Sequence, residues 1–186
     1  MNTSSNSPAI TQLQQAVHRV PDFPVEGVLF EDLTPVLADT KLFSLLIDEL
    51  ERQIVDKGAI TKIAGIEARG FIFGAALAQR LGVGFVPIRK AGKLPPPIDT
   101  VSYSLEYGEA TIEFSQGLLN KDDKILLVDD VLATGGTAKA AKKLIEKQNA
   151  AVTQLAVVID IGFFAGKGSR KLLEEQGLVI SSLWIS

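Results

Sequence analysis

The sequence contains no cysteine and only one histidine, His18. Without cysteine the chain has no disulfide, no thiolate nucleophile and no cysteine-based zinc site. A Ser-His-Asp mechanism would have to use His18, which falls in an amphipathic N-terminal segment rather than beside a serine flanked by glycines. We therefore expect His18 to face solvent or a partner, and we expect no transition-metal site made only of protein ligands.

A strong charge of one sign and a long apolar run are missing as well. The 186 residues carry 19 Lys and Arg against 22 Asp and Glu, a formal charge of −3. The chain thus lacks the broad basic surface that nucleic acid requires. The N-terminus is polar, and no stretch approaches about 18 uninterrupted apolar residues. We expect a single cytoplasmic domain, residues 1–186, that binds neither nucleic acid nor membranes and whose residues 1–7 are disordered.

Segment 124–139, KILLVDDVLATGGTAK, contains the main candidates for chemistry. Residues 125–128 form a continuous branched apolar run, which is typical of a strand buried on both faces of a parallel sheet. Asp129 and Asp130 then follow at the carboxyl end of the strand, the edge where open α/β sheets bind ligands. Two carboxylates at this edge are well placed to hold vicinal hydroxyls or to stabilise a developing positive charge.

A loop of small residues follows the acidic pair and leads into a good helix former. The loop consists of Ala133, Thr134, Gly135, Gly136 and Thr137. Such a loop can direct backbone N–H groups and two hydroxyls at one phosphate, and the dipole of the following helix favours the anion. A turn with a threonine N-cap is the alternative for each part taken alone. The complete order of strand, acidic pair, glycine loop and helix favours an anion site.

The rest of the chain alternates between helix-like and strand-like segments. Hydrophobic periodicity predicts helices near 8–19, 42–55, 71–81 and 171–176, and strands at 63–66, 84–88, 152–159 and 178–183. Residues 101–107 alternate with period two, and 110–114 can return as the second arm of a hairpin, either a lid or a plain edge hairpin. Loop 22–37 keeps several large apolar side chains, so we expect it to be packed. The pattern predicts an α/β fold with a mostly parallel sheet flanked by helices.

Two further groups of residues could hold anions at the same sheet edge. They are the strand-to-helix turn of Glu67, Ala68, Arg69 and Gly70, and the cations after strand 84–88, which are Arg89, Lys90 and Lys93. The turn offers backbone N–H groups and a guanidinium, although an arginine in such a turn is often only a surface cap. The three cations lie at the ligand edge, which favours phosphate contact over a merely solvated face.

The motif VDDVLATGGTA resembles the 5-phosphoribosyl diphosphate (PRPP) motif of type I phosphoribosyltransferases. FPVEGVLFEDLTPVL, GIEARGFIFGAALAQRLGVGFVPIRKAGKLP and SYSLEYG are similar, in the same order, to segments of the adenine-specific members. The resemblance implies the type I fold, with a small hood, a flexible hairpin lid at about residues 92–115, and a homodimer. It also implies transfer of the phosphoribosyl group from PRPP to adenine with Mg²⁺, giving AMP and diphosphate in purine salvage.

The resemblance assigns roles toward PRPP to these candidates. Asp129 and Asp130 would stabilise the ribose and its cationic transition state, and loop 133–137 would hold the 5′-phosphate. The turn 67–70, with a cis peptide between its first two residues, would hold the diphosphate together with the three cations after strand 84–88. Mg²⁺ would be held mainly by PRPP itself.

The resemblance also assigns roles toward the base. Leu29, Phe30 and Glu31 would bind adenine, chiefly through backbone groups, although many relatives carry a basic residue in place of Glu31. Glu106 would exchange a proton with adenine N7, and the lid residues Tyr103 and Tyr107 would help to cover the site. The alternatives are a phosphoribosyltransferase for another purine base, such as xanthine, and a non-catalytic regulator that senses PRPP or purines.

Overall fold

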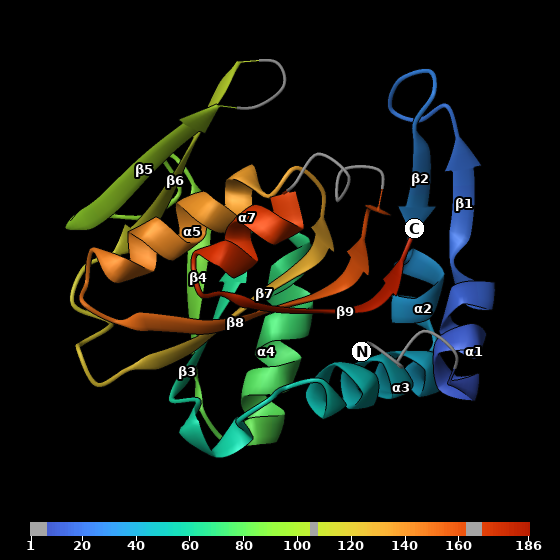
Figure 1. Cartoon of the computed structure of the whole chain (residues 1–186), viewed down its shortest axis with the longest axis horizontal. Helices are drawn as coiled ribbons and strands as arrows, with labels where there is room; N and C mark the ends of the chain where they lie inside the picture. Colours follow the sequence, from blue (N-terminus) through green and yellow to red (C-terminus); the bar gives the residue numbers. More distant parts are fainter. Residues whose placement is uncertain (1–6, 105–107, 163–168) are drawn as a thin grey trace. The chain divides into compact units, whose positions relative to one another are not determined.

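The computed structural model describes residues 7–104, 108–162 and 169–186. The chain divides into two compact units, Met1–Arg52 and Gln53–Ser186. Figure 1 shows the elements of both units along the chain. Among the described helices, none is long and apolar enough to cross a membrane. Residues 1–6, most of the segment predicted to be disordered, lie outside the described part, whereas Ser7 caps the first helix with its side chain.

In residues 7–52, the described part of the first unit, the chain forms three helices and a two-stranded antiparallel sheet. Its elements are α1 (Pro8–Ala16), β1 (His18–Pro21), β2 (Leu29–Asp32), α2 (Thr34–Ala38) and α3 (Thr40–Arg52). The predicted helix 8–19 was too long: Val17 is extended and His18 pairs with Asp32 across the sheet. The three-residue spacing of Val17 and Val20 suits a helix, but the pairing of β1 with β2 makes this segment a strand. His18 is exposed, as expected.

Two other expectations for this part of the chain need correction. Helix α3 ends at Arg52, so the predicted helix 42–55 extends three residues too far. The loop before β2 is also less packed than predicted, because Phe23 is 50% exposed and Val25 61% exposed. The Phe23 ring does meet Phe30 edge to face, with centroids 5.3 Å apart. An aromatic pair therefore gives this loop a local anchor.

The second unit is built on a seven-stranded sheet in the order β5-β6-β4-β3-β7-β8-β9. The strands are β3 (Lys62–Ile66), β4 (Gly84–Lys90), β5 (Ile98–Ser104), β6 (Glu109–Ser115), β7 (Lys124–Leu132), β8 (Ala151–Asp160) and β9 (Val179–Ile185). The strands β4, β3, β7, β8 and β9 are parallel to one another. Strands β5 and β6 form an antiparallel hairpin, and β6 pairs with the C-terminal end of β4. The predicted α/β fold with a mostly parallel sheet is confirmed.

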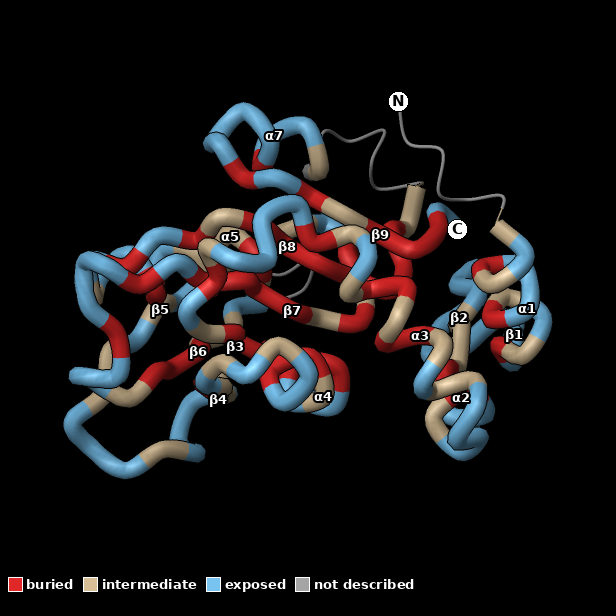
Figure 2. The backbone as a smooth tube through the Cα atoms, turned by 90° about the horizontal axis from the view of Figure 1, so that it is seen from below, coloured by how far each residue is buried: buried red, intermediate tan, exposed pale blue. Residues whose placement is uncertain are grey.

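Helices cover both faces of this sheet. They are α4 (Arg69–Leu81), α5 (Gly136–Glu146) and α7 (Ser169–Glu175), and the short 3₁₀ helix η2 (Lys57–Ala59) precedes β3. Figure 2 shows α4 on one side of the strands and α7 on the other, with buried residues along β7 and β8 between them. Residues 125–128 are all fully buried, as a strand covered on both faces requires. Trp184 is 2% exposed on β9, so its ring is packed in the interior.

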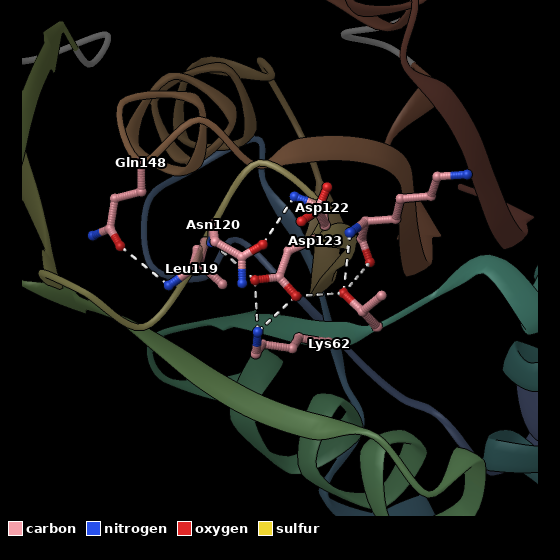
Figure 3. Close-up of polar contacts among 8 residues, drawn as sticks. Lys62, Leu119, Asn120, Asp122, Asp123 and Gln148 are labelled. Atoms are coloured by element: carbon pink, nitrogen blue, oxygen red, sulfur yellow. Dashed lines mark hydrogen bonds and ion pairs between the residues drawn. The ribbon is translucent and has the colours of Figure 1, made fainter.

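A network of polar side chains joins the N-terminal ends of β3 and β7 (Figure 3). Asp123 accepts hydrogen bonds from Lys62 Nζ at 2.6 Å and from Thr61 Oγ1 at 2.8 Å. Burial alone would raise the pKa of Asp123, but these donors and the Asn120 N–H hold it below its usual value. Since β3 and β7 are parallel, Asp129 lies toward their opposite ends. This network therefore supports the sheet away from the ligand edge.

Candidate active site

The acidic pair lies within β7 rather than after it. The strand continues to Leu132, so Asp129 and Asp130 occupy its last half. Pairing with β8, which resumes at Val131, extends the strand beyond the end of the apolar run. Asp130 is 5% exposed and forms an ion pair with Arg69, which lies at the start of α4. The sequence placed both carboxylates at the correct edge but ended the strand too early.

Asp129 is in an unfavourable environment for a charge. Burial raises the pKa of Asp129 well above its usual value, and the neighbouring Asp130 carboxylate raises it further. Its Oδ1 accepts the Asp130 N–H at 2.9 Å, which offsets only part of this effect. Because the folded state binds this proton more tightly than the unfolded state, Asp129 favours folding less as the pH rises through its folded pKa. A cationic ligand at this position would relieve the repulsion between the two carboxylates.

The small-residue loop forms the turn between β7 and α5. Gly135 is the N-cap of α5, with φ of 77°, and α5 has no side-chain cap hydrogen bond among the described residues. The threonine N-cap considered as an alternative is therefore not what the structure shows. A positive φ favours glycine at this position. The turn leaves the N-terminal end of α5, with its dipole, directed at the space next to Asp129.

An open pocket lies at this turn. The hollow is small and open to solvent. The lining residues come from β7, the loop, α5 and β8: Asp129, Val131, Leu132, Ala133, Thr134, Gly135, Thr137, Ala138, Leu155 and Val157. The pocket therefore brings one member of the acidic pair together with four of the five predicted phosphate-loop residues. An anion at the α5 N-terminus would lie in the same hollow as a group held by Asp129.

The second predicted anion loop packs directly against β7. A Cβ atom on Gly70 would lie 2.6 Å from the Val128 carbonyl oxygen and 3.1 Å from Asp129 Cα. Only a residue without a side chain lets the first turn of α4 approach the strand this closely. The peptide between Glu67 and Ala68 is cis, as the resemblance implies. The turn 67–70 and the acidic pair are thus adjacent in the fold.

The Glu67 carboxylate connects this turn to the cations after β4. It accepts the Lys90 N–H at 2.9 Å and two Arg89 guanidinium N–H groups at 3.3 Å. The Lys90 hydrogen bond lowers the pKa of Glu67, against the effect of burial, and Arg89 lowers it further. Arg89 also donates to the Lys93 carbonyl oxygen at 3.3 Å. The two predicted diphosphate segments are therefore linked, and Glu67 keeps its negative charge.

Glu113 is a residue of this region that the sequence analysis missed. It is 2% exposed on β6, and its carboxylate accepts the N–H groups of Gly92, Lys93 and Leu94 at 2.9, 2.6 and 2.5 Å. Burial alone would raise its pKa, but these three N–H groups hold the pKa below its usual value. The signal was a glutamate between two large apolar residues, Ile112 and Phe114, of the predicted second hairpin arm. Glu113 fixes the loop that carries Lys93.

Replacement of Glu113 by Gln tests this role. We expect a lower Tm, because the amide cannot match a carboxylate as acceptor for three N–H groups. Since the folded-state pKa is depressed, the stabilisation is present above the unfolded pKa of Glu and is lost as the pH falls through the folded pKa. The Tm difference between wild type and variant, measured from pH 7 to pH 3, should therefore shrink in acid. A difference that stays constant with pH would contradict the charge-based role.

The remaining predicted residues lie in two other places. Tyr103 is on β5, and its hydroxyl lies 3.1 Å from Thr137 Oγ1 at the start of α5. Glu106 and Tyr107 lie outside the described residues. Leu29, Phe30 and Glu31 belong to β2 in the first unit, where Glu31 accepts a hydrogen bond from Arg19 Nε at 3.0 Å. The Glu31 side chain is therefore already paired with a cation, which leaves backbone groups for a base.

Comparison with known proteins agrees with this geometry. The model of the phosphoribosyl transferase domain matches residues 36–181. The adenine phosphoribosyltransferase of Corynebacterium diphtheriae is 53% identical over 162 residues, covering 87% of this chain and 86% of the relative. The crystal structure of adenine phosphoribosyltransferase from Thermoanaerobacter pseudethanolicus has a TM-score of 0.88 at 40% identity, covering 95% of this chain and 99% of that one.

A structure from yeast adds a ligand-bound comparison. Saccharomyces cerevisiae adenine phosphoribosyltransferase, complexed with an imino-altritol bisphosphate and adenine, has a TM-score of 0.85 at 36% identity, covering 95% of this chain and 98% of that one. The domain match spans well over half of the chain, and the identities extend over most of its length. The chain therefore belongs to the phosphoribosyl transferase domain family and, within it, to the adenine phosphoribosyltransferases.

Proposed function

We propose that this protein is a transferase that moves the 5-phosphoribosyl group from PRPP to adenine, giving AMP and diphosphate in purine salvage. The observation that carries this proposal is the pocket where Asp129 meets the glycine loop at the N-terminus of α5. The names of the similar proteins indicate which base is used. The C. diphtheriae and T. pseudethanolicus relatives are adenine phosphoribosyltransferases, and the yeast structure contains adenine.

The chemistry requires a polyanion to be held while a cation forms. When the bond between the ribose C1 and the diphosphate oxygen breaks, the sugar becomes oxocarbenium-like before adenine attacks. In our proposal Asp129 and Asp130 stabilise this positive charge, and loop 133–137 holds the 5′-phosphate. The cations Arg69, Arg89, Lys90 and Lys93, with the turn at Gly70, bind the departing diphosphate.

The acidic pair also fits a role next to Mg²⁺. Among residues 7–104, 108–162 and 169–186, no group of three or more His, Cys, Asp or Glu is arranged to hold a metal ion. Mg²⁺ usually takes one or two protein carboxylates and completes its shell with water and substrate phosphates. Asp129 and Asp130 could therefore hold Mg²⁺ that arrives with PRPP. When bound, the ion would neutralise charge on the diphosphate.

Adenine recognition is assigned to β2 and to the hairpin. We propose that backbone groups of Leu29 and Glu31 read the base edge beside Phe30, and that Glu106 exchanges a proton with adenine N7. A buried carbonyl acceptor suits the exocyclic amine of adenine and rejects a base with a carbonyl there, which disfavours xanthine, hypoxanthine and guanine. Tyr103 and Tyr107 belong to the proposed lid, at about residues 92–115.

The assembly and cellular setting belong to the same proposal. We infer that the enzyme acts as a homodimer in the cytoplasm. Size-exclusion chromatography with light scattering tests the assembly, since a monomer would elute with the 19.9 kDa mass of one chain.

A product assay tests the activity and the base preference. Purified protein is incubated with Mg²⁺, PRPP and one of adenine, hypoxanthine, guanine or xanthine, and the nucleotides are separated by chromatography. We expect AMP from adenine and at least about 100-fold slower product formation from the other bases. Preferred use of xanthine would support the other-base alternative. Binding of PRPP without any product would instead indicate a regulator.

A further inference from the structure

The β5–β6 hairpin is attached along the length of α5, the helix that starts at the phosphate loop. Near the C-terminal end of α5, Lys147 Nζ donates to the Thr100 carbonyl oxygen at 2.7 Å. Gln148 Nε2 donates to the Ser115 carbonyl oxygen at 2.9 Å and to Asp99 Oδ2 at 3.2 Å. The stem of the hairpin is therefore fixed to α5 by both of its strands, as Figure 1 shows for these neighbouring elements.

A separate contact joins the hairpin to the other end of α5. The Tyr103 hydroxyl lies 3.1 Å from Thr137 Oγ1, and the Tyr103 ring packs against the core beside the helix. A Cβ on Gly136 would lie 3.5 Å from Tyr103 Cδ2, so the ring also lies against the glycine loop. Thr137 lines the pocket, whereas Tyr103 contacts Thr137 without being one of the lining residues. Tyr103 is thus held at the position where the phosphate loop becomes a helix.

The hydrogen bond between the Tyr103 and Thr137 hydroxyls can run in either direction, and a bound phosphate would fix which hydroxyl donates. Either hydroxyl can be the donor when the pair is alone. The oxygens of a phosphate dianion only accept hydrogen bonds. Thr137 must therefore donate its single hydroxyl hydrogen to the phosphate and accept a hydrogen bond from Tyr103. The two hydrogen bonds then run in series, and each polarises the other. With phenylalanine at position 103, the Thr137 hydroxyl would lose this partner.

We propose that Tyr103 is a positioning residue of the 5′-phosphate site. Its hydroxyl orients the Thr137 hydroxyl toward the phosphate. This inference rests on the proposed function, because it assigns the 5′-phosphate of PRPP to loop 133–137. It goes beyond a covering role for Tyr103, since the tyrosine acts through Thr137 on one group of the substrate. The diphosphate end of PRPP should not respond to this residue.

Calorimetric titration with two probes tests the proposal. Ribose 5-phosphate has the 5′-phosphate but no diphosphate. Inorganic diphosphate has the diphosphate group but no 5′-phosphate. For Tyr103→Phe we expect about fivefold weaker binding of ribose 5-phosphate, with diphosphate affinity unchanged. In steady-state assays KM for PRPP should rise by a similar factor, while kcat stays within about twofold. Thr137→Val should have a larger effect, and Tyr103→Phe should add nothing to it.

A second hydroxyl pair in the same hairpin provides the control. Ser102 Oγ and Thr111 Oγ1 lie 2.8 Å apart across β5 and β6, on an exposed face. Ser102→Ala removes a hydroxyl pair of the same kind and should leave the affinities for ribose 5-phosphate and for diphosphate unchanged. Equal ribose 5-phosphate affinity in wild type and Tyr103→Phe would overturn the inference, as would parallel loss for both probes with a lower Tm. If wild type bound no ribose 5-phosphate and formed no AMP, the proposed function itself would be wrong.

Discussion

Replacement of both Asp129 and Asp130 by Asn should reduce AMP formation by at least about 1,000-fold. Each single loss of an electrostatic stabiliser in an active site typically reduces kcat by about 100- to 1,000-fold. The double change removes both negative charges from the edge of β7, including the Asp130 carboxylate that forms an ion pair with Arg69. The effect should fall mainly on kcat, since the positive charge that we propose these groups stabilise develops in the transition state.

The single variant Asp129→Asn separates catalysis from stability. Burial and the neighbouring carboxylate raise the pKa of Asp129 in the folded protein, so its charged form opposes folding. An uncharged amide of nearly the same shape should therefore raise the Tm at pH 8, while activity falls strongly. This gain should disappear in acid, below the folded pKa, where Asp129 is already protonated in the wild type. Thermal unfolding at several pH values, with AMP assays on the same samples, measures both effects.

Asp122→Asn is the matched control for the acidic pair. Asp122 is exposed and lies in the polar network at the opposite edge of the sheet, where its backbone N–H bonds to Asn120 Oδ1 at 2.9 Å. The change removes one negative charge from the chain without touching the pocket. We expect activity within about twofold of wild type and a Tm close to it. Near-normal turnover of the double variant at 129 and 130 would show that the ribose assignment is wrong.

The sequence predicted the second unit well because its signals are local. Residues 125–128 are apolar without interruption, and only a strand covered on both faces accommodates such a run. The glycines of the phosphate loop and the cis peptide after Glu67 followed from the motif and its resemblance. The strand limits were less accurate, since the continuation of β7 through Asp129 and Asp130 depends on its pairing with β8. Pairing partners are not visible in a local pattern.

The contacts that organise the site were not predictable from residue patterns. Glu113 lies 19 to 21 residues from the N–H groups that it binds, and Glu67 lies 23 residues from Lys90. Each is a carboxylate whose partners become neighbours only when β4 pairs with β3 and β6. The N-terminal helix was predicted three residues too long for a related reason, because the pairing of β1 with β2 outweighed a helical apolar spacing. Long-range partners therefore account for most of what the sequence analysis missed.

Gly70→Ala should destabilise the protein and impair catalysis together. The added Cβ would lie 2.6 Å from the Val128 carbonyl oxygen and 3.1 Å from both Asp129 Cα and Oδ1. Most of these atoms are backbone, so the helix α4 or the strand β7 has to move. Overpacking of this kind costs about 1–3 kcal/mol, which lowers the Tm by roughly 2–12 °C for a chain of this size.

The catalytic effect follows from which atoms are displaced. Relief of the clash would shift Asp129 relative to loop 133–137, and misplacement by about 1 Å can reduce a rate by about 100-fold. We expect kcat/KM to fall at least tenfold even at temperatures where the variant is fully folded. Gly58→Ala is the control, because its Cβ would meet nothing closer than Asp56 Oδ1 at 4.0 Å. If Gly70→Ala matched Gly58→Ala in both Tm and rate, the close packing of α4 on β7 would not be what positions the acidic pair.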